Sequence, residues 1–258
     1  MAEPMGFYTD TTVCIGCKAC EVACKEWNQL PARNGGVGVL SGNSYDNTRA
    51  LDGTHWRHVK FIEQFSTDRQ DGRWLMMSDV CKHCAHAGCL EVCPTGAIIR
   101  TEFDTVVIQS DTCNGCRDCI GACPFGVIGV NPVSGTAQKC TLCYDRMIDD
   151  QTPACAKTCP TTSIKFGDHA GMVALAKERV AELHAQGRTE ARLYGANELD
   201  GVGGTGSVFL LLDEPEVYGL PPDPRVPTAD LPRMFKHAGL AAAGMAAAAL
   251  ISFIGGRR

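Results

Sequence analysis

All sixteen cysteines of this 258-residue chain fall into four groups of four. In chain order the groups are Cys14, Cys17, Cys20 and Cys24; Cys81, Cys84, Cys89 and Cys93; Cys113, Cys116, Cys119 and Cys123; and Cys140, Cys143, Cys155 and Cys159. The first and third groups share the spacing C-x2-C-x2-C-x3-C, whereas one gap is stretched to four residues in the second group and to eleven in the fourth. A chain with this pattern must fold so that its thiols meet in sets.

The C-x2-C-x2-C-x3-C spacing is that of bacterial ferredoxins, in which three thiolates bind one iron–sulfur cluster and the fourth reaches a different cluster. Proline follows the last cysteine of three groups (Pro94, Pro124 and Pro160), which completes the ferredoxin pattern. Four 4Fe-4S clusters would use every cysteine as a ligand. The pattern therefore predicts four clusters and assigns all sixteen cysteines to them.

Disulfide bonds and zinc are the two competing uses of cysteine. Eight disulfides suit a small secreted scaffold, but a chain of this length can bury an ordinary core, and clustered C-x2-C pairs are poor disulfide partners. Zinc also accepts four thiolates, but zinc modules usually carry two C-x2-C pairs separated by a longer spacer. Three cysteines crowded before a fourth favour iron–sulfur clusters over a zinc scaffold without redox activity.

The charge of the chain indicates a redox protein rather than a nucleic-acid-binding protein. The formal net charge is −5, and an oxidised 4Fe-4S cluster with its thiolates carries about −2, so four clusters bring the total to about −13. Nucleic-acid binding requires a positive surface. Six cations in the cysteine segments are expected either to be solvated singly or, as a set, to tune the clusters: Lys18, Lys25, Lys82, Arg117, Lys139 and Lys157.

Short apolar runs between the cysteine groups predict two β-hairpins. Residues 97–100 (AIIR) and 105–109 (TVVIQ) flank one turn, and residues 126–130 (GVIGV) and 137–139 (AQK) flank another. This alternation of cluster loop and hairpin is the ferredoxin plan. We therefore expect an α+β fold with a duplicated bacterial-ferredoxin-like architecture, that is, two dicluster modules.

Spacing alone does not say which cysteine groups pair. Groups two and three are separated by 19 residues, and groups three and four by 16 residues. Either pair could form a local two-cluster ferredoxin, so both arrangements stay open at this point.

The remaining segments predict an insertion and a C-terminal extension. Residues 25–80 form a long insertion, rich in Gly and Asn at 34–47 and strand-like at 55–65. After the last cysteine group we expect a strand at 163–167, a helix at 172–186 with Asp168 as N-cap and Gly187 at its end, a strand at 207–213, and a Pro-rich strap or linker at 214–227.

The C-terminal residues 238–256 (AGLAAAGMAAAALISFIGG) contain no charged side chain. A helix of this length extends about 28 Å, close to the roughly 30 Å hydrocarbon core of a bilayer. Charged or titratable side chains flank it on both sides: Arg233, Lys236 and His237 before it, and Arg257 and Arg258 after it. We interpret the segment as a single transmembrane helix, with an Ala-rich helix in a soluble core as the alternative.

Small residues four positions apart suit this helix to close packing on partner helices. Gly239 with Ala243 and Gly244 with Ala248 have that spacing. Cations on both sides of the segment leave its orientation open by the charge rule. We expect the cluster domain to lie on the extracytoplasmic face of the cell membrane.

Several segments together carry a family resemblance. They are GFYTDTTVCIGCKACEVACKEWN, THWRHVKFIEQF, DVCKHCAHAGCLEVCPTGAI, DTCNGCRDCIGACPFGVI, and KCTLCYDRM with PACAKTCPTTSIKFG. With the C-terminal helix, they resemble the iron–sulfur (beta) subunit of respiratory, membrane-bound formate dehydrogenase over nearly the whole chain. That family belongs to the four-cluster electron-transfer subunits of molybdenum and tungsten oxidoreductases, whose nitrate, dimethyl sulfoxide and polysulfide reductase branches share the cysteine pattern.

The resemblance implies that the chain relays electrons from a molybdopterin (Mo or W) catalytic subunit, which oxidises formate to carbon dioxide, to a membrane cytochrome b subunit that reduces quinone. It implies no catalytic residue in this chain. The alternative is the same role in another molybdoenzyme or in a hydrogenase-linked complex. Related nitrate reductase subunits replace one ligand by tryptophan, whereas all sixteen positions are cysteine here.

The resemblance also implies a crossed pairing of the groups. The four ligand sets would be Cys14, Cys17, Cys20 with Cys159; Cys140, Cys143, Cys155 with Cys24; Cys81, Cys84, Cys89 with Cys123; and Cys113, Cys116, Cys119 with Cys93. The chain would then comprise an outer dicluster module (1–24 and 140–167), an insertion (25–80), an inner dicluster module (81–139), a C-terminal helix, strand and Pro-rich strap (168–232), and a transmembrane anchor (233–258).

Three histidines are the remaining candidate functional residues. His83 and His86 lie in the second cysteine group, where they could donate hydrogen bonds to a cluster. Loop histidines with ordinary partners are the competing interpretation. His237 lies beside Arg233 and Lys236, where contact with the membrane surface and its lipid is expected.

Overall fold

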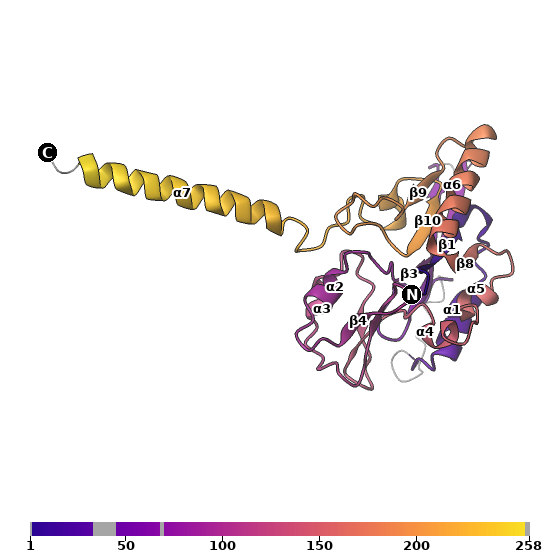
Figure 1. Cartoon of the computed structure of the whole chain (residues 1–258). Helices are drawn as coiled ribbons and strands as arrows, with labels where there is room; N and C mark the ends of the chain where they lie inside the picture. The colour runs from indigo at the N-terminus through magenta and orange to yellow at the C-terminus, as the bar shows by residue number, and fades with distance from the viewer. Residues whose placement is uncertain (1, 33–44, 68–69, 256–258) are drawn as a thin grey trace.

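The computed structural model describes residues 2–32, 45–67 and 70–255, so most of the Gly- and Asn-rich stretch at 34–47 lies outside the described residues. A mixed four-stranded sheet has the order β8-β1-β10-β9 (Figure 1). Its strands are β1 (Met5–Asp10), β8 (Ile164–Asp168), β9 (Arg192–Tyr194) and β10 (Ser207–Leu211). β1 pairs in parallel with β10 and antiparallel with β8. The sheet therefore joins the start of the chain to segments that follow the last cysteine, and it confirms the two strands predicted there.

Helix α6 (His169–Ala185) packs against this sheet. At its start, Asp168 Oδ1 accepts a 2.6 Å hydrogen bond from the backbone N–H of Gly171, a donor that no helical carbonyl can satisfy. Just beyond its end, Gly187 has a φ of +84°, the left-handed conformation that makes glycine the favoured residue at this position. The predicted helix and both of its end signals are confirmed.

The hydrophobic core lies between the sheet, α6 and a long hairpin. Its least exposed apolar side chains include Phe7, Tyr8, Met77, Val80, Ala176, Leu183, Val208, Phe209, Leu210 and Leu211. β10 is buried along its whole length. Its sequence, SVFLL, is therefore a nearly unbroken apolar run rather than an alternating pattern.

The long hairpin consists of β2 (Arg57–Phe65) and β3 (Gly72–Val80). β2 confirms the strand expected at 55–65, whereas the sequence pattern does not predict β3. The second half of β3 is buried on both faces, so it lacks the alternation that identifies a strand. The two short hairpins between cysteine groups are confirmed: β4 (Ile98–Arg100) with β5 (Val106–Ile108), and β6 (Gly129–Val130) with β7 (Ala137–Gln138).

Short helices accompany the cysteine segments. They are α1 (Ala19–Trp27), α2 (Gly88–Glu91), α3 (Asp118–Gly121), α4 (Tyr144–Met147) and α5 (Ala154–Lys157). α1 packs against α5, and α2 packs against α3 (Figure 1). The first cysteine segment thus lies beside the fourth, and the second lies beside the third. Spacing alone leaves open whether the third group lies beside the second or the fourth, and the tertiary packing places it beside the second.

The Pro-rich segment at 214–227 packs on the body of the molecule. It contains a 3-10 turn, η3 (Pro215–Tyr218), in which Tyr218 is buried. The Tyr218 hydroxyl accepts a 3.2 Å hydrogen bond from the Leu212 backbone N–H, and its carbonyl accepts a 2.8 Å hydrogen bond from Lys60 Nζ on β2. The segment is therefore a strap over the hairpin rather than a free linker.

Helix α7 (Leu231–Gly255) projects away from the rest of the molecule (Figure 1). It is long and apolar enough to cross a membrane, and within the described residues nothing buries it. The uncharged segment is helical up to Gly255, while Arg257 and Arg258 lie outside the described residues. An apolar helix of this size without intramolecular partners requires a membrane or a partner protein to cover it.

Candidate cluster-binding sites

The cysteine loops of the first and third groups share a local conformation. Gly16 and Gly115, in equivalent positions, have φ values of +65° and +73°, and the residues two positions later, Lys18 and Arg117, are also left-handed. A Cβ on Gly16 would lie 2.5 Å from Phe61 Cε1, so this turn requires glycine. Alternating left-handed residues keep the chain tightly turned between successive thiols.

One cavity is lined by the thiols of the first predicted set: Cys14, Cys17, Cys20 and Cys159. Val59 and Ile164 contribute apolar side chains to the same cavity. Burial raises the pKa of Cys14, and the neighbouring Cys159 and Cys17 thiolates raise it further. The structure therefore brings a thiol of the fourth group into contact with the first group.

The second predicted set is completely buried: Cys24, Cys140, Cys143 and Cys155. Burial raises the pKa of Cys24 well above its usual value, and the thiolates of the other three raise it further. Cys24 lies on α1 and Cys155 lies on α5, and these two helices pack against each other. A backbone N–H also faces this set, since that of Leu142 donates a 3.3 Å hydrogen bond to Cys140 Sγ.

Another cavity is lined by the thiols of the third predicted set: Cys81, Cys84, Cys89 and Cys123. Burial raises the pKa of Cys84 well above its usual value, as do the neighbouring thiolates of Cys81, Cys123 and Cys89. The side chains of His83 and Lys139 also line this cavity. Here the second group receives its fourth thiol from the third group.

The fourth predicted set has the same mixture of exposed, partly buried and buried thiols as the first set: Cys93, Cys113, Cys116 and Cys119. Burial raises the pKa of Cys119 to about 11, with contributions from the Cys113, Cys116 and Cys93 thiolates. Burial also opposes ionisation of Cys93, but the Thr95 hydroxyl and backbone N–H groups at 95–98 lower its pKa overall. Donors that stabilise the thiolate prepare this side chain to act as a ligand.

The arrangement of these sets fits a cluster better than a single ion. A zinc site needs four donors about 2.0–2.3 Å from one point. Among the described residues, no three His, Cys, Asp or Glu side chains converge closely enough to hold one ion. The two sets that line cavities surround a space, which suits a cluster that offers a different iron atom to each thiolate.

Two of the six cations considered above are buried beside the thiols. Lys139 Nζ donates to the backbone carbonyls of Val106 and Cys140, and it lines the cavity of the third set. Lys82 is also completely buried, but its ammonium group pairs with Asp79. The other four are at least partly exposed: Lys18, Lys25, Arg117 and Lys157. Lys18 pairs with Glu21 and Asp46, and Lys25 Nζ donates to the backbone carbonyls of Pro31 and Thr54.

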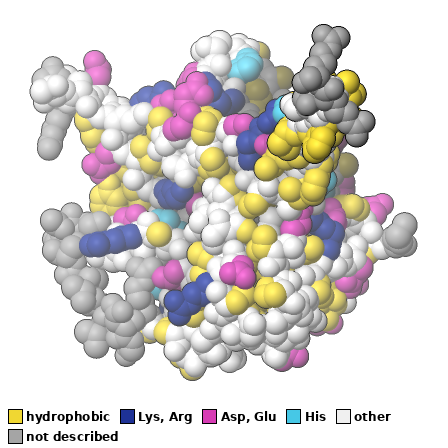
Figure 2. Space-filling view, turned by 90° about the vertical axis from the view of Figure 1, so that its left-hand side faces the viewer, with side chains coloured by type: hydrophobic (Ala, Val, Ile, Leu, Met, Phe, Trp, Pro, Cys, Tyr) yellow, Lys and Arg dark blue, Asp and Glu magenta, His cyan; other side chains and the backbone are white. Residues whose placement is uncertain are grey.

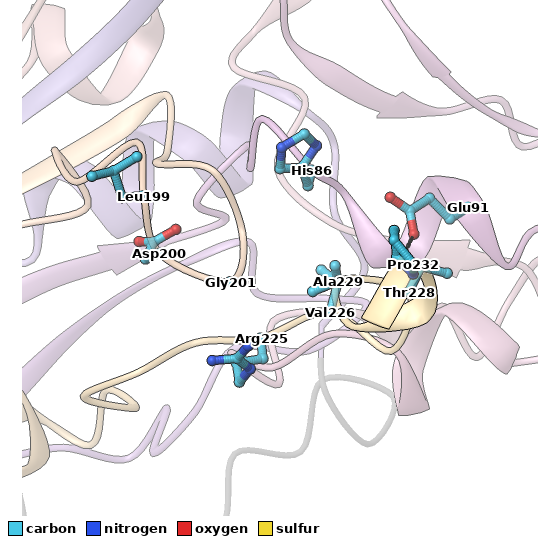
Figure 3. A pocket seen from close by; sticks show the side chains of 10 residues that line it. All are labelled: His86, Glu91, Leu199, Asp200, Gly201, Arg225, Val226, Thr228, Ala229 and Pro232. Atoms are coloured by element: carbon cyan, nitrogen blue, oxygen red, sulfur yellow. Dashed lines mark hydrogen bonds between the residues drawn. The ribbon is translucent and has the colours of Figure 1, made fainter. Parts of the chain in front are cut away.

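His83 and His86 have different surroundings. His83 is buried, and its Nδ1 accepts a 3.1 Å hydrogen bond from the Val106 backbone N–H. Burial lowers the pKa of His83 well below its usual value, so the ring is neutral with its proton on Nε2, for which the described residues offer no acceptor. His86 is exposed and lines a separate pocket of about 410 Å³ at the start of α7 (Figure 3). His83 therefore remains a candidate donor to the third set.

Sequence reasoning misses two residues beside the first two sets, Arg57 and Ser78. The Ser78 hydroxyl lies 3.2 Å from Cys20 Sγ, and Arg57 is 2% exposed. Arg57 begins a strand whose sequence mixes polar and apolar residues, a pattern that usually places arginine in solvent. No local sequence pattern identifies it as buried.

Comparison with known proteins identifies the type of domain. Two family models, both described as a 4Fe-4S dicluster domain, match residues 13–97 and 72–169. Together they span all four cysteine groups.

Similarity to individual proteins identifies the family within this domain type. The sequence is 44% identical to the formate dehydrogenase-O iron-sulfur subunit of Escherichia coli, over 87% of its own length and 73% of that protein. It is 43% identical to the formate dehydrogenase iron-sulfur subunit of Haemophilus influenzae, over 84% and 68%. A thiosulfate reductase electron transfer subunit of Salmonella typhi is less similar, at 39% over 61% and 72%. With its four sets of thiols and this degree of identity, the protein belongs to the family of formate dehydrogenase iron–sulfur subunits.

Proposed function

We propose that this protein binds four 4Fe-4S clusters through the four crossed cysteine sets and relays electrons within a formate dehydrogenase complex. The observation that carries the proposal is the exchange of single cysteines: Cys24 and Cys159 between the first and fourth groups, and Cys93 and Cys123 between the second and third. When bound, such clusters accept and donate single electrons. The protein's own thiols, backbone N–H groups and buried cations hold them and set their environment.

The position of α7 supports a direction for the electron path. α2 and α3, with the third and fourth thiol sets, lie on the side of the body from which α7 projects, and α1 and α5 lie farther from it (Figure 1). The segment before α7 is attached to α2, since Thr228 Oγ1 donates to Glu91 Oε2. We therefore propose that the third and fourth sets face the membrane and that the first and second sets face the catalytic subunit.

Exposed thiols and apolar side chains support the positions of two partners. Cys17 is exposed beside Ile15, which is 59% exposed, and Val22 is also exposed on α1. We propose that a molybdopterin (Mo or W) formate dehydrogenase catalytic subunit covers this end. Cys116 is exposed in the fourth set, and a membrane cytochrome b subunit that reduces quinone would receive electrons there.

The region around α7 suits a membrane-bound partner. Side chains of both charge signs are scattered over the face of the molecule from which α7 projects (Figure 2). The pocket at this base includes Glu91, Asp200 and Arg225 (Figure 3), which a polar segment of the cytochrome subunit could contact. We propose that α7 crosses the cell membrane once among lipid and partner helices, with the cluster domain on the extracytoplasmic face.

The proposed division of the chain follows the thiol sets. Residues 1–24 with 140–167 form the outer module and residues 81–139 the inner module. Residues 25–80 form the insertion that supplies the long hairpin, 168–232 the C-terminal helix, strand and strap, and 233–258 the anchor. Contact between α1 and α5 and between α2 and α3 supports the two modules.

Anaerobic purification of the membrane complex through an affinity tag on this subunit tests the function. Formate should reduce the clusters of the complex, seen as partial bleaching of the visible absorption, whereas the isolated subunit should respond to dithionite but not to formate. A complex that reacts with dimethyl sulfoxide, polysulfide or nitrate instead of formate would support the alternative, the same relay in another molybdoenzyme. A colourless complex would contradict both.

A further inference from the structure

Arg57 is a buried charge between two thiol sets. It is 2% exposed at the start of β2. Its Nη1 donates hydrogen bonds to the hydroxyl and carbonyl oxygens of Ser78, at 3.0 and 3.4 Å. The guanidinium carbon lies 4.9 Å from the centroid of the Phe7 ring. These contacts fix the plane of the side chain but leave part of it unused.

The unused part consists of Nε and Nη2, which are buried and have no hydrogen-bond partner within the described residues. Nε carries one N–H and Nη2 carries two. None of the ion pairs found among the described residues involves Arg57. A buried, permanently charged guanidinium without a counter-ion is strongly unfavourable, so its surroundings must supply negative charge.

That negative charge comes from thiols of two different sets. Burial alone would lower the pKa of Arg57, but the thiolates of Cys155, Cys20, Cys140 and Cys24 raise it above its usual value. Cys20 belongs to the first proposed set, and the other three belong to the second. The packing agrees, because β2 lies against α1, which carries Cys20 and Cys24, and α1 lies against α5, which carries Cys155. Arg57 therefore lies beside both outer sets, with Ser78 bridging it to Cys20 Sγ.

We propose that Arg57 is a positioning residue that raises the reduction potentials of both outer clusters by directing its free N–H groups toward them. The inference rests on the proposed function, because it requires clusters in the first and second sets. A positive charge and N–H donors stabilise the reduced cluster, which carries one more negative charge than the oxidised cluster. Arginine suits this role because it keeps its charge when buried and donates in two directions from one plane.

Lys139 is also a buried cation beside the thiols, but its ammonium group has hydrogen-bond acceptors. Its Nζ already donates to two backbone carbonyls, those of Val106 and Cys140. Its thiol neighbours are Cys81 and Cys89 of the third set and Cys140 of the second. Arg57 retains unpartnered donors, and its thiol neighbours come from the first and second sets.

Potentiometric titration of the whole complex, followed by electron paramagnetic resonance (EPR), tests the inference. In Arg57→Gln the midpoint potentials of the two outer clusters should shift to more negative values, while those of the two inner clusters stay unchanged. Arg57→Lys keeps the charge and should give a smaller shift of the same sign. Ser78→Ala should shift the Cys20 cluster alone. Arg73→Gln is the matched control, because Arg73 lies on the same hairpin but pairs with Asp213 at the surface.

Iron content and cluster signals distinguish a failure of the role of Arg57 from a failure of the proposed function. A wild-type complex with four cluster signals supports the function, and outer potentials that do not move in a fully loaded Arg57→Gln complex would overturn only the role of Arg57. Equal shifts of all four clusters would also overturn it, since they indicate a general structural change. If Arg57→Gln fails to retain iron, the Arg57→Lys and Ser78→Ala complexes replace it in the test. Unshifted potentials in these two complexes, when fully loaded with iron, would likewise overturn the role of Arg57.

Discussion

The indole Nε1 of Trp27 donates a 2.7 Å hydrogen bond to Oδ2 of Asp145. Trp27 ends α1, whereas Asp145 lies in α4, 118 positions later in the chain. The guanidinium carbon of Arg146 also lies 4.1 Å from the Trp27 ring centroid. A single aromatic side chain thus joins the first cysteine segment to the fourth, between which we propose that Cys24 and Cys159 are exchanged.

Substitution of Trp27 should loosen the first and second thiol sets. Trp27→Phe removes the hydrogen bond and should cost about 1 kcal/mol, and Trp27→Ala also removes the contact with Arg146 and should cost about 2 kcal/mol. The measurement is the denaturant concentration at which visible cluster absorption is lost under anaerobic conditions. Equal midpoints for the wild type and Trp27→Ala would show that this contact does not hold the segments together.

Serine substitutions test the crossed pairing. Cys24→Ser and Cys140→Ser should perturb the same EPR signal, because both thiols belong to one set. Cys14→Ser and Cys159→Ser should perturb a second, common signal. If Cys14→Ser and Cys24→Ser instead affect one and the same signal, each cysteine run closes its own cluster and the pairing is wrong.

The buried carboxylate of Asp79 provides a prediction on stability. Its Oδ2 lies 3.0 Å from Lys60 Nζ, and its Oδ1 contacts Lys82 Nζ, which is completely buried. Asp79→Asn leaves that ammonium group uncompensated and should destabilise the fold by about 3–5 kcal/mol.

Asp213→Asn is the control for Asp79. It removes a partly exposed ion pair with Arg73 and should cost about 0–1 kcal/mol. Chemical denaturation of both variants, followed by far-ultraviolet circular dichroism, measures the difference. Similar midpoints for the two variants would mean that Lys82 finds another partner when Asp79 is absent.

Local features of the fold could be predicted from the sequence, whereas long-range features could not. The ligand spacing, both short hairpins and the Asp168 cap depend on neighbouring residues, and all of them have sequence signals. The parallel pairing of β1 with β10 depends on tertiary packing. The same is true of the exchange of Cys24 for Cys159, which spacing leaves open and only the family resemblance implies.

Arg57 shows the same limit at the level of a single side chain. Strand sequences with arginine usually place it in solvent, and no local pattern marks this one as buried. Its environment arises only when β2 packs against α1 and β3 places Ser78 beside it. The electrostatic environment of the sites is therefore a property of the fold rather than of any motif.

Truncation after Pro232 tests the role of α7. The shortened protein should keep all four clusters, because no cysteine follows Cys159 and α7 buries nothing in the described body. Formate-to-dye activity of the complex should persist while formate-to-quinone activity falls, and the truncated protein should leave the membrane fraction more readily, since Ala- and Gly-rich helices gain stability by packing on neighbours. Unchanged quinone reduction with unchanged membrane retention would show that residues 233–258 neither anchor nor dock the protein.

The central claim is that all sixteen cysteines hold four 4Fe-4S clusters, and a direct count of iron and acid-labile sulfide tests it. The anaerobically purified protein should contain about 16 iron atoms and about 16 sulfides per polypeptide. Fewer than about 12 iron atoms per fully assembled polypeptide, or zinc in stoichiometric amount, would contradict the claim.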